Sequence, residues 1–331
     1  MSARDSTTAR EFLRLADALL DKGYRLGPKI GEGTYAKVRI CERNNDGKIM
    51  AVKIVNFEKA SKDYLLKFMP RELGIIKRIN HKNIITTHEV IENNGMIFMI
   101  IDYAERGDLL CHIREHGALP DKEAKRIFKQ ILSAVEYLHS LNIAHRDLKC
   151  ENILIMRDRS VAVSDFGFAR PMDLGSPPKE KFLTSTFCGS PSYAPPEVLC
   201  GIPYDPKLSD VWSLGVLLYI MVCGTMPFDD TNVRKMVNKQ LHHEMVFPAK
   251  IAHQLNSDCK QLIEQMLQPQ LDRRLTIEEI LTSTWLSTGK KVTGKKSRIK
   301  SHREKSHRKK VTNNSCIGIE CVPYVLSFLF I

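Results

Sequence analysis

One short segment gathers most of the residue types that catalytic sites need. It runs from His145 to Asn152 and places a histidine, an arginine, an aspartate, a lysine and an asparagine within eight positions. Thirteen residues after Asn152, Asp165 opens an Asp-Phe-Gly triplet. Asp147 can accept a proton from a hydroxyl group, and the side-chain oxygens of Asn152 and Asp165 are ligands that Mg²⁺ prefers. These residue types therefore favour a site that holds Mg²⁺ and accepts a proton from a hydroxyl group.

A second set of candidates lies earlier in the chain. Gly31 and Gly33 stand between two expected strands, where small residues let backbone N–H groups approach phosphate oxygens. A strand follows them, so the segment is not a dinucleotide-binding fingerprint, and Ala36 stands where a third glycine is usual. Lys53 lies inside an apolar strand, where an ammonium group is costly unless a carboxylate such as Glu72 pairs with it. Taken alone, the two glycines are also typical of a tight hairpin. Lys53 alone is also compatible with an edge strand on which it points to solvent.

The expected elements around these residues change character near residues 102–107. Strands are predicted at 24–33, 36–43, 48–55, 86–92 and 96–102, and a helix at 70–79. After residue 107, the apolar spacing of 121–140 predicts an amphipathic helix, and a second apolar helix fits 209–223. Helices dominate up to about residue 286. The expected fold is therefore α+β, with a small β-rich lobe followed by a larger helical lobe.

The excess positive charge lies in one segment near the end of the sequence. The 331 residues include 50 Lys+Arg and 38 Asp+Glu, for a net charge of +12. Residues 290–310 hold eleven basic residues and one acid, a net charge of +10, which leaves +2 for the remainder. A nucleic-acid-binding fold for the whole protein is therefore disfavoured.

The cysteines and the lengths of the apolar runs indicate the cellular compartment in which the protein is expected. The nine cysteines are scattered singly without a Cys-x-x-Cys pair, as expected for reduced thiols rather than for disulfides or a zinc site. We expect neither a secretory signal nor a membrane span of about 18 apolar residues. A cytoplasmic location is the expectation. Residues 1–23 form a flank whose apolar residues between 12 and 20 fit a short helix packed on the body.

In this order and spacing, the motifs of residues 24–286 resemble the eukaryotic protein kinase superfamily. The resemblance implies a two-lobed kinase fold, with an N-lobe at about 24–102 and a C-lobe at about 108–286. Residues 287–331 are expected to form a basic, disordered tail with an apolar end. It also implies phosphoryl transfer from MgATP to serine or threonine hydroxyls of proteins. The segments "HRDLKCENIL", "SDFGFAR" and "TFCGSPSYAPPEVL" are similar to the testis-specific serine/threonine kinases of the calcium/calmodulin-dependent-kinase-like group. That similarity implies a role in spermatid differentiation and adds the nucleus and the sperm flagellum as locations.

The resemblance assigns a role to each candidate residue. Asp147 would be the catalytic base, while Lys149 and Lys53 would offset charge on the transferred phosphoryl group. Asn152 and Asp165 would hold Mg²⁺. The other expected nucleotide contacts cover the phosphates, enclose the adenine or line the hinge and ribose: Ile30, Gly31, Gly33, Val38, Ala51, Lys53, Glu72, Asp102, Asp108 and Leu154.

The segment from Asp165 to Glu197 resembles an activation segment. Thr186 stands where kinases accept an activating phosphate, whose charge would pair with Arg146 and order the loop. The neighbouring hydroxyls of Ser185 and Thr184 are competing sites.

Two positions depart from the kinase pattern. The usual Ala-Pro-Glu reads Pro195-Pro196-Glu197, and Gln270 replaces an acidic residue. Neither change removes a catalytic group, and Glu197 is still expected to pair with Arg274.

Two alternatives stay open at this point. A pseudokinase scaffold would lack Lys53, Asp147 or Asp165, and all three are present. The second alternative is a nucleic-acid-binding or membrane-binding module in the tail, with the kinase as a passenger. The basic run itself fits a solvated tail, a nuclear-import signal or a patch that contacts an anionic membrane. Expected partners are protein substrates, an upstream activating kinase and a chaperone, without sequence-specific nucleic acid. Asp108 and Glu151 favour a mild preference for arginine upstream of the target hydroxyl.

Overall fold

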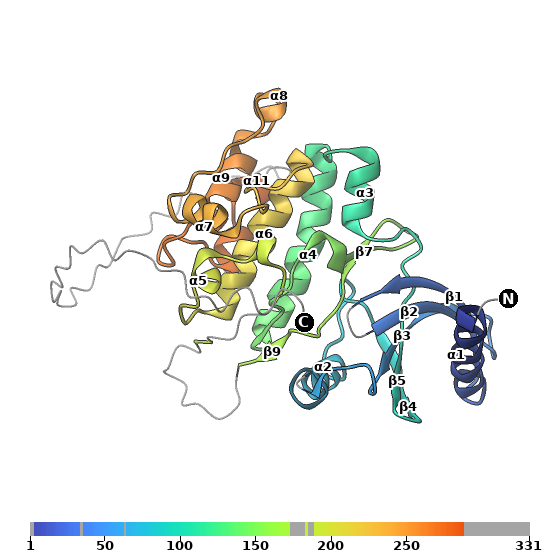
Figure 1. The fold of residues 1–331 in the computed structure, drawn as a ribbon. Helices are drawn as coiled ribbons and strands as arrows, with labels where there is room; N and C mark the ends of the chain where they lie inside the picture. The colour runs from blue at the N-terminus through green and yellow to red at the C-terminus, as the bar shows by residue number, and fades with distance from the viewer. Residues whose placement is uncertain (1–2, 34–35, 63, 173–182, 185–188, 288–331) are drawn as a thin grey trace.

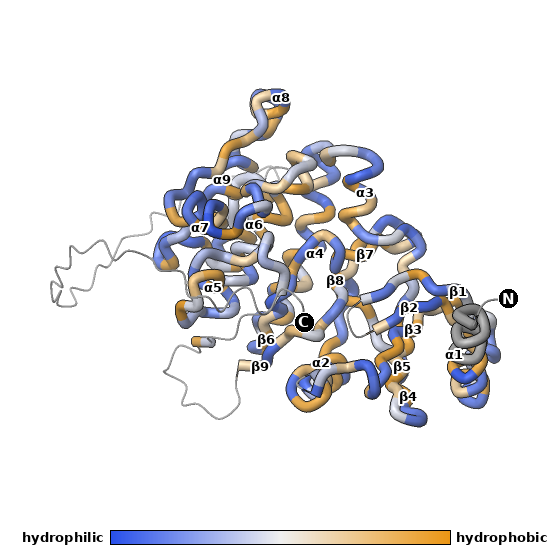
Figure 2. Tube along the Cα trace, in the orientation of Figure 1, coloured by the Kyte–Doolittle hydropathy of each residue, from blue (hydrophilic) through white to orange (hydrophobic). Residues whose placement is uncertain are grey.

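The smaller lobe is built on one antiparallel sheet of five strands (Figure 1). The computed structural model describes residues 3–33, 36–62, 64–172, 183–184 and 189–287. The strands are β1 (Tyr24–Glu32), β2 (Ala36–Arg43), β3 (Ile49–Asn56), β4 (Thr87–Asn93) and β5 (Met96–Ile101), in the spatial order β1-β2-β3-β5-β4. β5 is hydrophobic along its length in Figure 2 and is buried at nearly every position, because its alternate residues pack in two different hydrophobic clusters. The expected β-rich lobe is confirmed.

Helix α1 (Ala3–Leu20) lies beside β1 at the outer side of the sheet (Figure 1). Leu15 and Leu19, one helical turn apart, are buried in a cluster that includes Met50 and Phe98 from the sheet. The Arg39 side chain lies over the ring of Phe12, 4.8 Å from its centre. The expected flanking helix is thus confirmed, it is longer than expected, and it completes the core of the smaller lobe.

Helix α2 (Met69–Ile76) carries Glu72, whose side chain is directed toward Lys53 of β3. It follows the short π-helix η1 (Tyr64–Phe68) and buries Met69, Glu72 and Ile75. Met69 packs with Val55 and Met99 of the sheet. This packing holds the helix with Glu72 directed inward.

The larger lobe is helical. Its helices are α3 (Leu109–His116), α4 (Asp121–Ser140), α5 (Pro196–Leu199), α6 (Pro206–Cys223), α7 (Val233–Leu241), α8 (Ala249–Ala252), α9 (Ser257–Met266), α10 (Ile277–Leu281) and α11 (Thr284–Ser287). α6 is long and apolar enough to cross a membrane, but 89% of it is buried inside this lobe, where it packs on α4 and α9. It is the central core helix, as its all-round hydrophobicity indicates.

Two small sheets hold the loops between the lobes. β6 (Ile143–Ala144) pairs with β9 (Arg170–Pro171), and β7 (Ile153–Ile155) pairs with β8 (Val161–Val163). The short 3₁₀ helix η2 (Cys150–Asn152) lies between β6 and β7. The segment from His145 to Asp165 is therefore tied at both ends, which fixes the positions of the predicted catalytic residues.

Candidate active site

The loop that carries Asp147 is anchored on the core helix. The buried carboxylate of Asp210 on α6 accepts hydrogen bonds from the backbone N–H of Arg146 at 2.8 Å and of His145 at 2.9 Å. The ring of His139 contacts the same carboxylate at 2.8 Å. Arg146 has a φ of 64°, a left-handed conformation that costs free energy in a residue with a side chain. Asp210, which sequence analysis did not single out, holds this strained loop in place.

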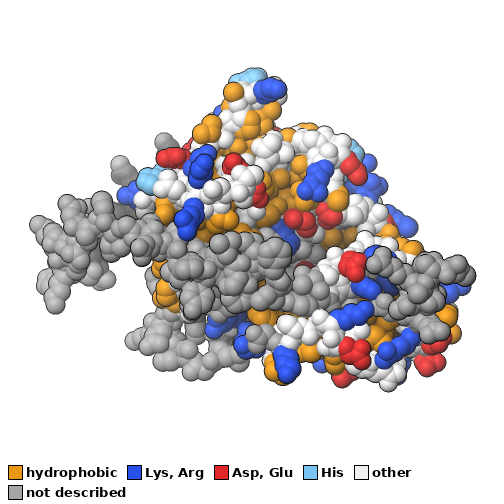
Figure 3. Space-filling view, viewed as in Figure 1, with side chains coloured by type: hydrophobic (Ala, Val, Ile, Leu, Met, Phe, Trp, Pro, Cys, Tyr) orange, Lys and Arg blue, Asp and Glu red, His pale blue; other side chains and the backbone are white. Residues whose placement is uncertain are grey.

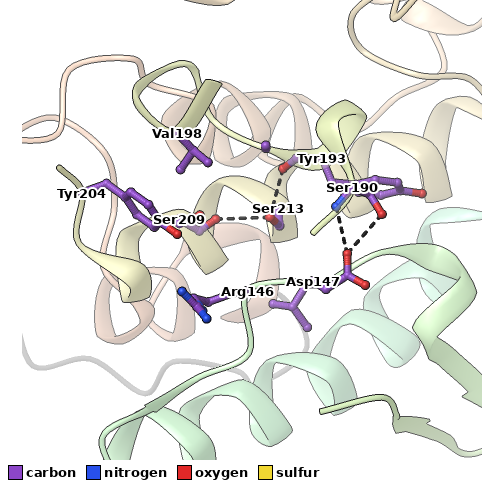
Figure 4. Close-up of a pocket in the computed structure, with 10 residues that line it drawn as sticks. Arg146, Asp147, Ser190, Tyr193, Val198, Tyr204, Ser209 and Ser213 are labelled. Carbon is purple, nitrogen blue, oxygen red and sulfur yellow. Dashed lines mark hydrogen bonds between the residues drawn. The ribbon is translucent and has the colours of Figure 1, made fainter. Parts of the chain in front are cut away.

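The Asp147 carboxylate accepts contacts from four donors. Its Oδ2 lies 2.9 Å from Nζ of Lys149 and 3.1 Å from Nδ2 of Asn152. Its Oδ1 accepts the Ser190 N–H at 3.0 Å and the Ser190 hydroxyl at 3.1 Å, as Figure 4 shows. Lys149 also donates to the Ser190 hydroxyl at 3.0 Å. The structure thus places the three predicted residues together and shows that this carboxylate accepts a hydroxyl hydrogen bond.

Asn152 and Asp165 fit a magnesium site. Both amide hydrogens of Asn152 are directed to Asp147, one to its carboxylate and one to its backbone oxygen at 2.8 Å, so the amide oxygen is the atom left for a cation. Asp165 takes a left-handed φ of 62°, and its side chain is 45% exposed. Among the described residues, no group of three or more His, Cys, Asp and Glu side chains could hold a metal. An amide oxygen and one carboxylate still suit Mg²⁺, which usually retains water and binds substrate phosphates.

Lys53 joins the smaller lobe to this site through two carboxylates. Its Nζ lies 2.7 Å from Oε1 of Glu72 and 3.0 Å from Oδ1 of Asp165. Burial disfavours the charge on Lys53, yet Asp165 and Glu72 outweigh that effect and raise the pKa of Lys53 well above its usual value. The Lys53 ammonium in turn lowers the pKa of Asp165 to about 2. Both partners are therefore charged at neutral pH, and the expected pairing of Lys53 with Glu72 is present.

The strand register brings predicted phosphate and adenine contacts into one row. Val38 of β2 is paired with Gly31 of β1 on one side and with Lys53 of β3 on the other. The hairpin that contains Gly33 is closed by a hydrogen bond from its N–H to the Ala36 oxygen at 2.8 Å. Gly31, Val38 and Lys53 therefore lie side by side across three strands.

The predicted hinge and ribose residues lie where the two lobes join. Leu154 of β7 forms an isolated bridge with Asp108, which caps α3 by accepting the Cys111 N–H at 2.8 Å. The Asp102 carboxylate contacts the His88 ring at 2.7 Å and also accepts the N–H of Thr86. A nucleotide contact at Asp102 would therefore use its backbone. Of the remaining predicted contacts, Ala51 is buried in β3 and Ile30 is exposed on β1.

Ser190 contacts the predicted catalytic carboxylate, although sequence analysis did not single it out. The available signal was its place directly after Gly189, whose φ of 88° suits glycine. A Cβ atom at Gly189 would lie only 2.5 Å from the backbone oxygen of Arg146. The lack of a side chain at 189 is therefore what lets Ser190 reach Asp147. Both residues line a small cavity of about 10 Å³ with Tyr193, which is too small for a substrate (Figure 4).

The Gly189→Ala variant is expected to lower kcat by about 10²-fold, because the clash would displace Ser190 from the catalytic carboxylate. Steady-state phosphorylation kinetics would measure the loss. Gly95→Ala is the matched control, since Gly95 has a φ of 73° in the β4–β5 turn but a Cβ atom there would meet no other atom within 4 Å. Equal kcat values for the two variants would contradict the role given to the Gly189–Arg146 contact.

Comparison with known proteins agrees with this geometry. Residues 24–286 match the protein kinase domain family. The chain belongs to the protein kinase family. It is 46% identical over 272 residues to testis-specific serine/threonine-protein kinase 1 of Mus musculus, an alignment that covers 82% of this chain and 74% of that protein. It is 40% identical over 275 residues to testis-specific serine/threonine-protein kinase 3 of the same species, covering 83% of this chain and 100% of that protein.

This membership makes the chain a serine/threonine protein kinase. Protein kinases as a family transfer a phosphoryl group from ATP and use Mg²⁺. Membership of the family therefore supports this reaction for the site described above. The expected ion pair between Glu197 and Arg274 is confirmed, with contacts of 2.7 and 3.0 Å. The predicted phosphosite Thr186 lies outside the described residues.

Proposed function

We propose that this kinase phosphorylates serine or threonine residues of proteins that act in spermatid differentiation. The observation that carries the catalytic part is a connected set of contacts: Lys149 and Asn152 contact Asp147, and Lys53 of the smaller lobe contacts Asp165. Ser164, which precedes Asp165, joins the two groups by donating its N–H to the Asn152 backbone oxygen at 2.8 Å. The relatives are named testis-specific kinases, which supports a role for this kinase in male germ cells.

The side chains divide the work of phosphoryl transfer. Asp147 accepts the hydrogen bond of the substrate hydroxyl and aligns its oxygen, in the manner shown by the Ser190 hydroxyl. Lys149 and Lys53 place positive charge beside the transferred group, which develops negative charge in the transition state. Mg²⁺ bound by Asn152 and Asp165 would neutralise charge on the nucleotide phosphates.

An in vitro assay with labelled ATP and a generic basic protein tests the activity. The wild-type chain is expected to transfer label in the presence of Mg²⁺, and the Asp165→Ala chain to lose nearly all transfer while retaining its folded circular dichroism spectrum. Equal transfer by the two chains would assign the activity to a contaminant.

Phosphorylation of Thr186 is proposed as the activating step. Arg146 is buried next to the site, and its Nη1 has no hydrogen-bond partner among the described residues. Its Nε is held by the Phe168 oxygen at 2.8 Å, so the guanidinium has a defined direction. A buried guanidinium N–H without an acceptor is costly, and a phosphate would satisfy it. Of the competing sites, Thr184 is buried and accepts a hydrogen bond from Arg170, which disfavours it.

Replacing Thr186 by alanine is therefore expected to lower activity by at least tenfold, because the phosphate that pairs with Arg146 is lost. Mass-spectrometric mapping of the active chain should find phosphate on Thr186. Ser185→Ala serves as the neighbouring control. Active protein that lacks phosphate at Thr186 would refute the proposal.

Several finer assignments remain proposals. An upstream kinase or the chain itself would phosphorylate Thr186, and a chaperone would assist folding. The cytoplasm is the proposed location, with the nucleus or flagellum as further sites. A mild preference for upstream arginine rests on Asp108 and the exposed Glu151, whereas Ile220, where arginine-directed kinases often carry an acid, argues against a strong one.

A further inference from the structure

Helix α1 lies outside the kinase domain but is firmly attached to its smaller lobe. The helix ends before residue 24, where the match to the protein kinase family begins. Leu15 and Leu19 are buried against the sheet, and the Arg14 side chain donates to the Asn94 oxygen in the β4–β5 turn at 3.2 Å. The helix is therefore fixed at more than one point, and the reaction described above gives it no role.

The helix packs on the face of the sheet that is turned away from the Lys53 side chain. Successive residues of a strand point to opposite faces, so Val52 faces away from its neighbour Lys53. Val52 is buried in the same cluster as Leu15 and Leu19, and Figure 1 shows α1 alongside the sheet and away from the helical lobe. Any effect of α1 on a nucleotide bound beside Lys53 must therefore pass through the sheet.

The Arg39 side chain of β2 connects α1 with strand β1. Arg39 is paired with Val52, and directly opposed residues of neighbouring strands share a face, so its side chain lies on the α1 side of the sheet. The guanidinium lies over the Phe12 ring, 4.8 Å from the ring centre, and Nε donates to the Gly27 oxygen at 2.9 Å. Arginine can make both contacts because its donors lie in the plane of a group that also stacks on rings.

Strand β1 is irregular where it approaches Gly31. Its pairing with β2 shifts twice, first between Leu26 and Lys29 and again between Lys29 and Gly31. Bulges of this kind bend a strand and interrupt its ladder of hydrogen bonds, so the ladder fixes the direction of this stretch less firmly than that of a regular strand. Arg39 is paired with Lys29, between the two shifts, and its bond to the Gly27 oxygen spans the first of them.

Two predicted nucleotide contacts come directly after this irregular stretch. Gly31 follows the second register shift, and the hairpin that contains Gly33 comes next. Backbone N–H groups bind phosphate oxygens where they are directed at them, and a displacement of about 1 Å in a substrate-positioning group is costly. The bend of β1 before Gly31 therefore decides where these N–H groups lie over a nucleotide.

We propose that Arg39 is a positioning residue for nucleotide binding, and that α1 acts on the nucleotide site through the contact of Phe12 with Arg39. The Phe12 ring orients the guanidinium, the guanidinium holds the Gly27 carbonyl, and this carbonyl holds the bend of β1 before Gly31. The proposal rests on nucleotide binding at the kinase site described above. It adds to that site a helix that lies outside the family's domain.

Binding of MgADP to the full chain, measured by calorimetry, tests the proposal without depending on turnover. Arg39→Met keeps an unbranched side chain but removes the planar cation. It is expected to raise the Kd of MgADP by about fivefold, because the coupling is limited by the free energy of the one hydrogen bond that is lost. Arg39→Lys keeps the charge without the fork of donors, so its Kd should lie between those of the wild type and Arg39→Met. In steady-state assays, the KM for ATP should rise with the Kd while kcat and the KM for the protein substrate stay unchanged.

The Arg25→Met chain is the matched control. Arg25 is an exposed residue of β1 that pairs with Glu42 of β2. Figure 3 shows basic and acidic side chains interspersed over the visible face of the smaller lobe, so the loss of one exposed arginine changes the charge of this surface little. The Kd of MgADP for Arg25→Met should equal that of the wild type.

A double-mutant cycle tests the part played by the helix. Phe12→Leu removes the ring on which the guanidinium lies and leaves Leu15 and Leu19 to hold α1 in place. This change should raise the Kd of MgADP by about threefold, within the range of cation–π contacts. The chain with both Phe12→Leu and Arg39→Met should bind no more weakly than Arg39→Met alone, because the two side chains act in series.

The outcomes separate this proposal from the kinase function. A wild-type chain that binds MgADP and an Arg39→Met chain with the same Kd overturn the proposal and leave the kinase function intact, and a lower urea midpoint would then give Arg39 a structural role only. Equal losses in Arg39→Met and Arg25→Met assign the effect to surface charge and overturn it too. Effects that multiply in the double variant remove the path from α1. If Arg39→Met does not fold, Arg39→Lys and Phe12→Leu provide the same comparison. A wild-type chain that does not bind MgADP refutes both proposals.

Discussion

The Lys53→Met variant is expected to lose about 10²–10³-fold in kcat while its fold is retained. Lys53 contacts both Glu72 and Asp165 within 3.0 Å, and its side chain is only 17% exposed. Methionine has a similar length but offers no charge to the nucleotide phosphates, and it leaves the two carboxylates without their shared cation. Steady-state kinetics with a protein substrate would measure the loss, and circular dichroism would confirm the fold.

The exposed Lys48 in the β2–β3 turn provides the matched control for this prediction. Lys48→Met removes a lysine from the same lobe without touching the carboxylates, so its kcat should equal that of the wild type. Undiminished phosphoryl transfer by Lys53→Met would refute the assignment of Lys53 and, with it, the proposed charge arrangement.

The Arg274→Leu variant is expected to lower the free energy of unfolding by about 3–5 kcal/mol, because it leaves a buried carboxylate without its partner. Arg274 is fully buried, and its two terminal nitrogens contact the two oxygens of Glu197. It also donates to the Gln268 backbone oxygen and lies over the Trp212 ring at 5.0 Å. Urea unfolding followed by tryptophan fluorescence would measure the change.

The neighbouring Arg273 is exposed and provides the matched control for Arg274→Leu. Arg273→Leu changes the same residue type at the adjacent position, and its effect should stay within about 0.5 kcal/mol. If both variants unfolded at the same urea concentration, the Glu197–Arg274 pair would not be the structural contact that we infer.

Local sequence patterns predicted individual elements well. The apolar spacing of residues 121–140 predicted helix α4 with the bounds that the structure has, because one face of that helix is buried along its whole length. The extent of α1 was less predictable. Its apolar residues begin near Phe12, while the observed helix begins at Ala3.

Catalytic chemistry was the part that the sequence alone determined. Asp147, Asn152 and Asp165 lie within nineteen positions, so a single loop and its small sheets bring them together, and their residue types specify the ligands. The tertiary structure decided the contacts between distant segments. Lys53 meets Asp165 across 112 positions, and Asp210 supports the strained Arg146 from the core helix. Such contacts depend on how the lobes and helices pack, and no local spacing records that packing.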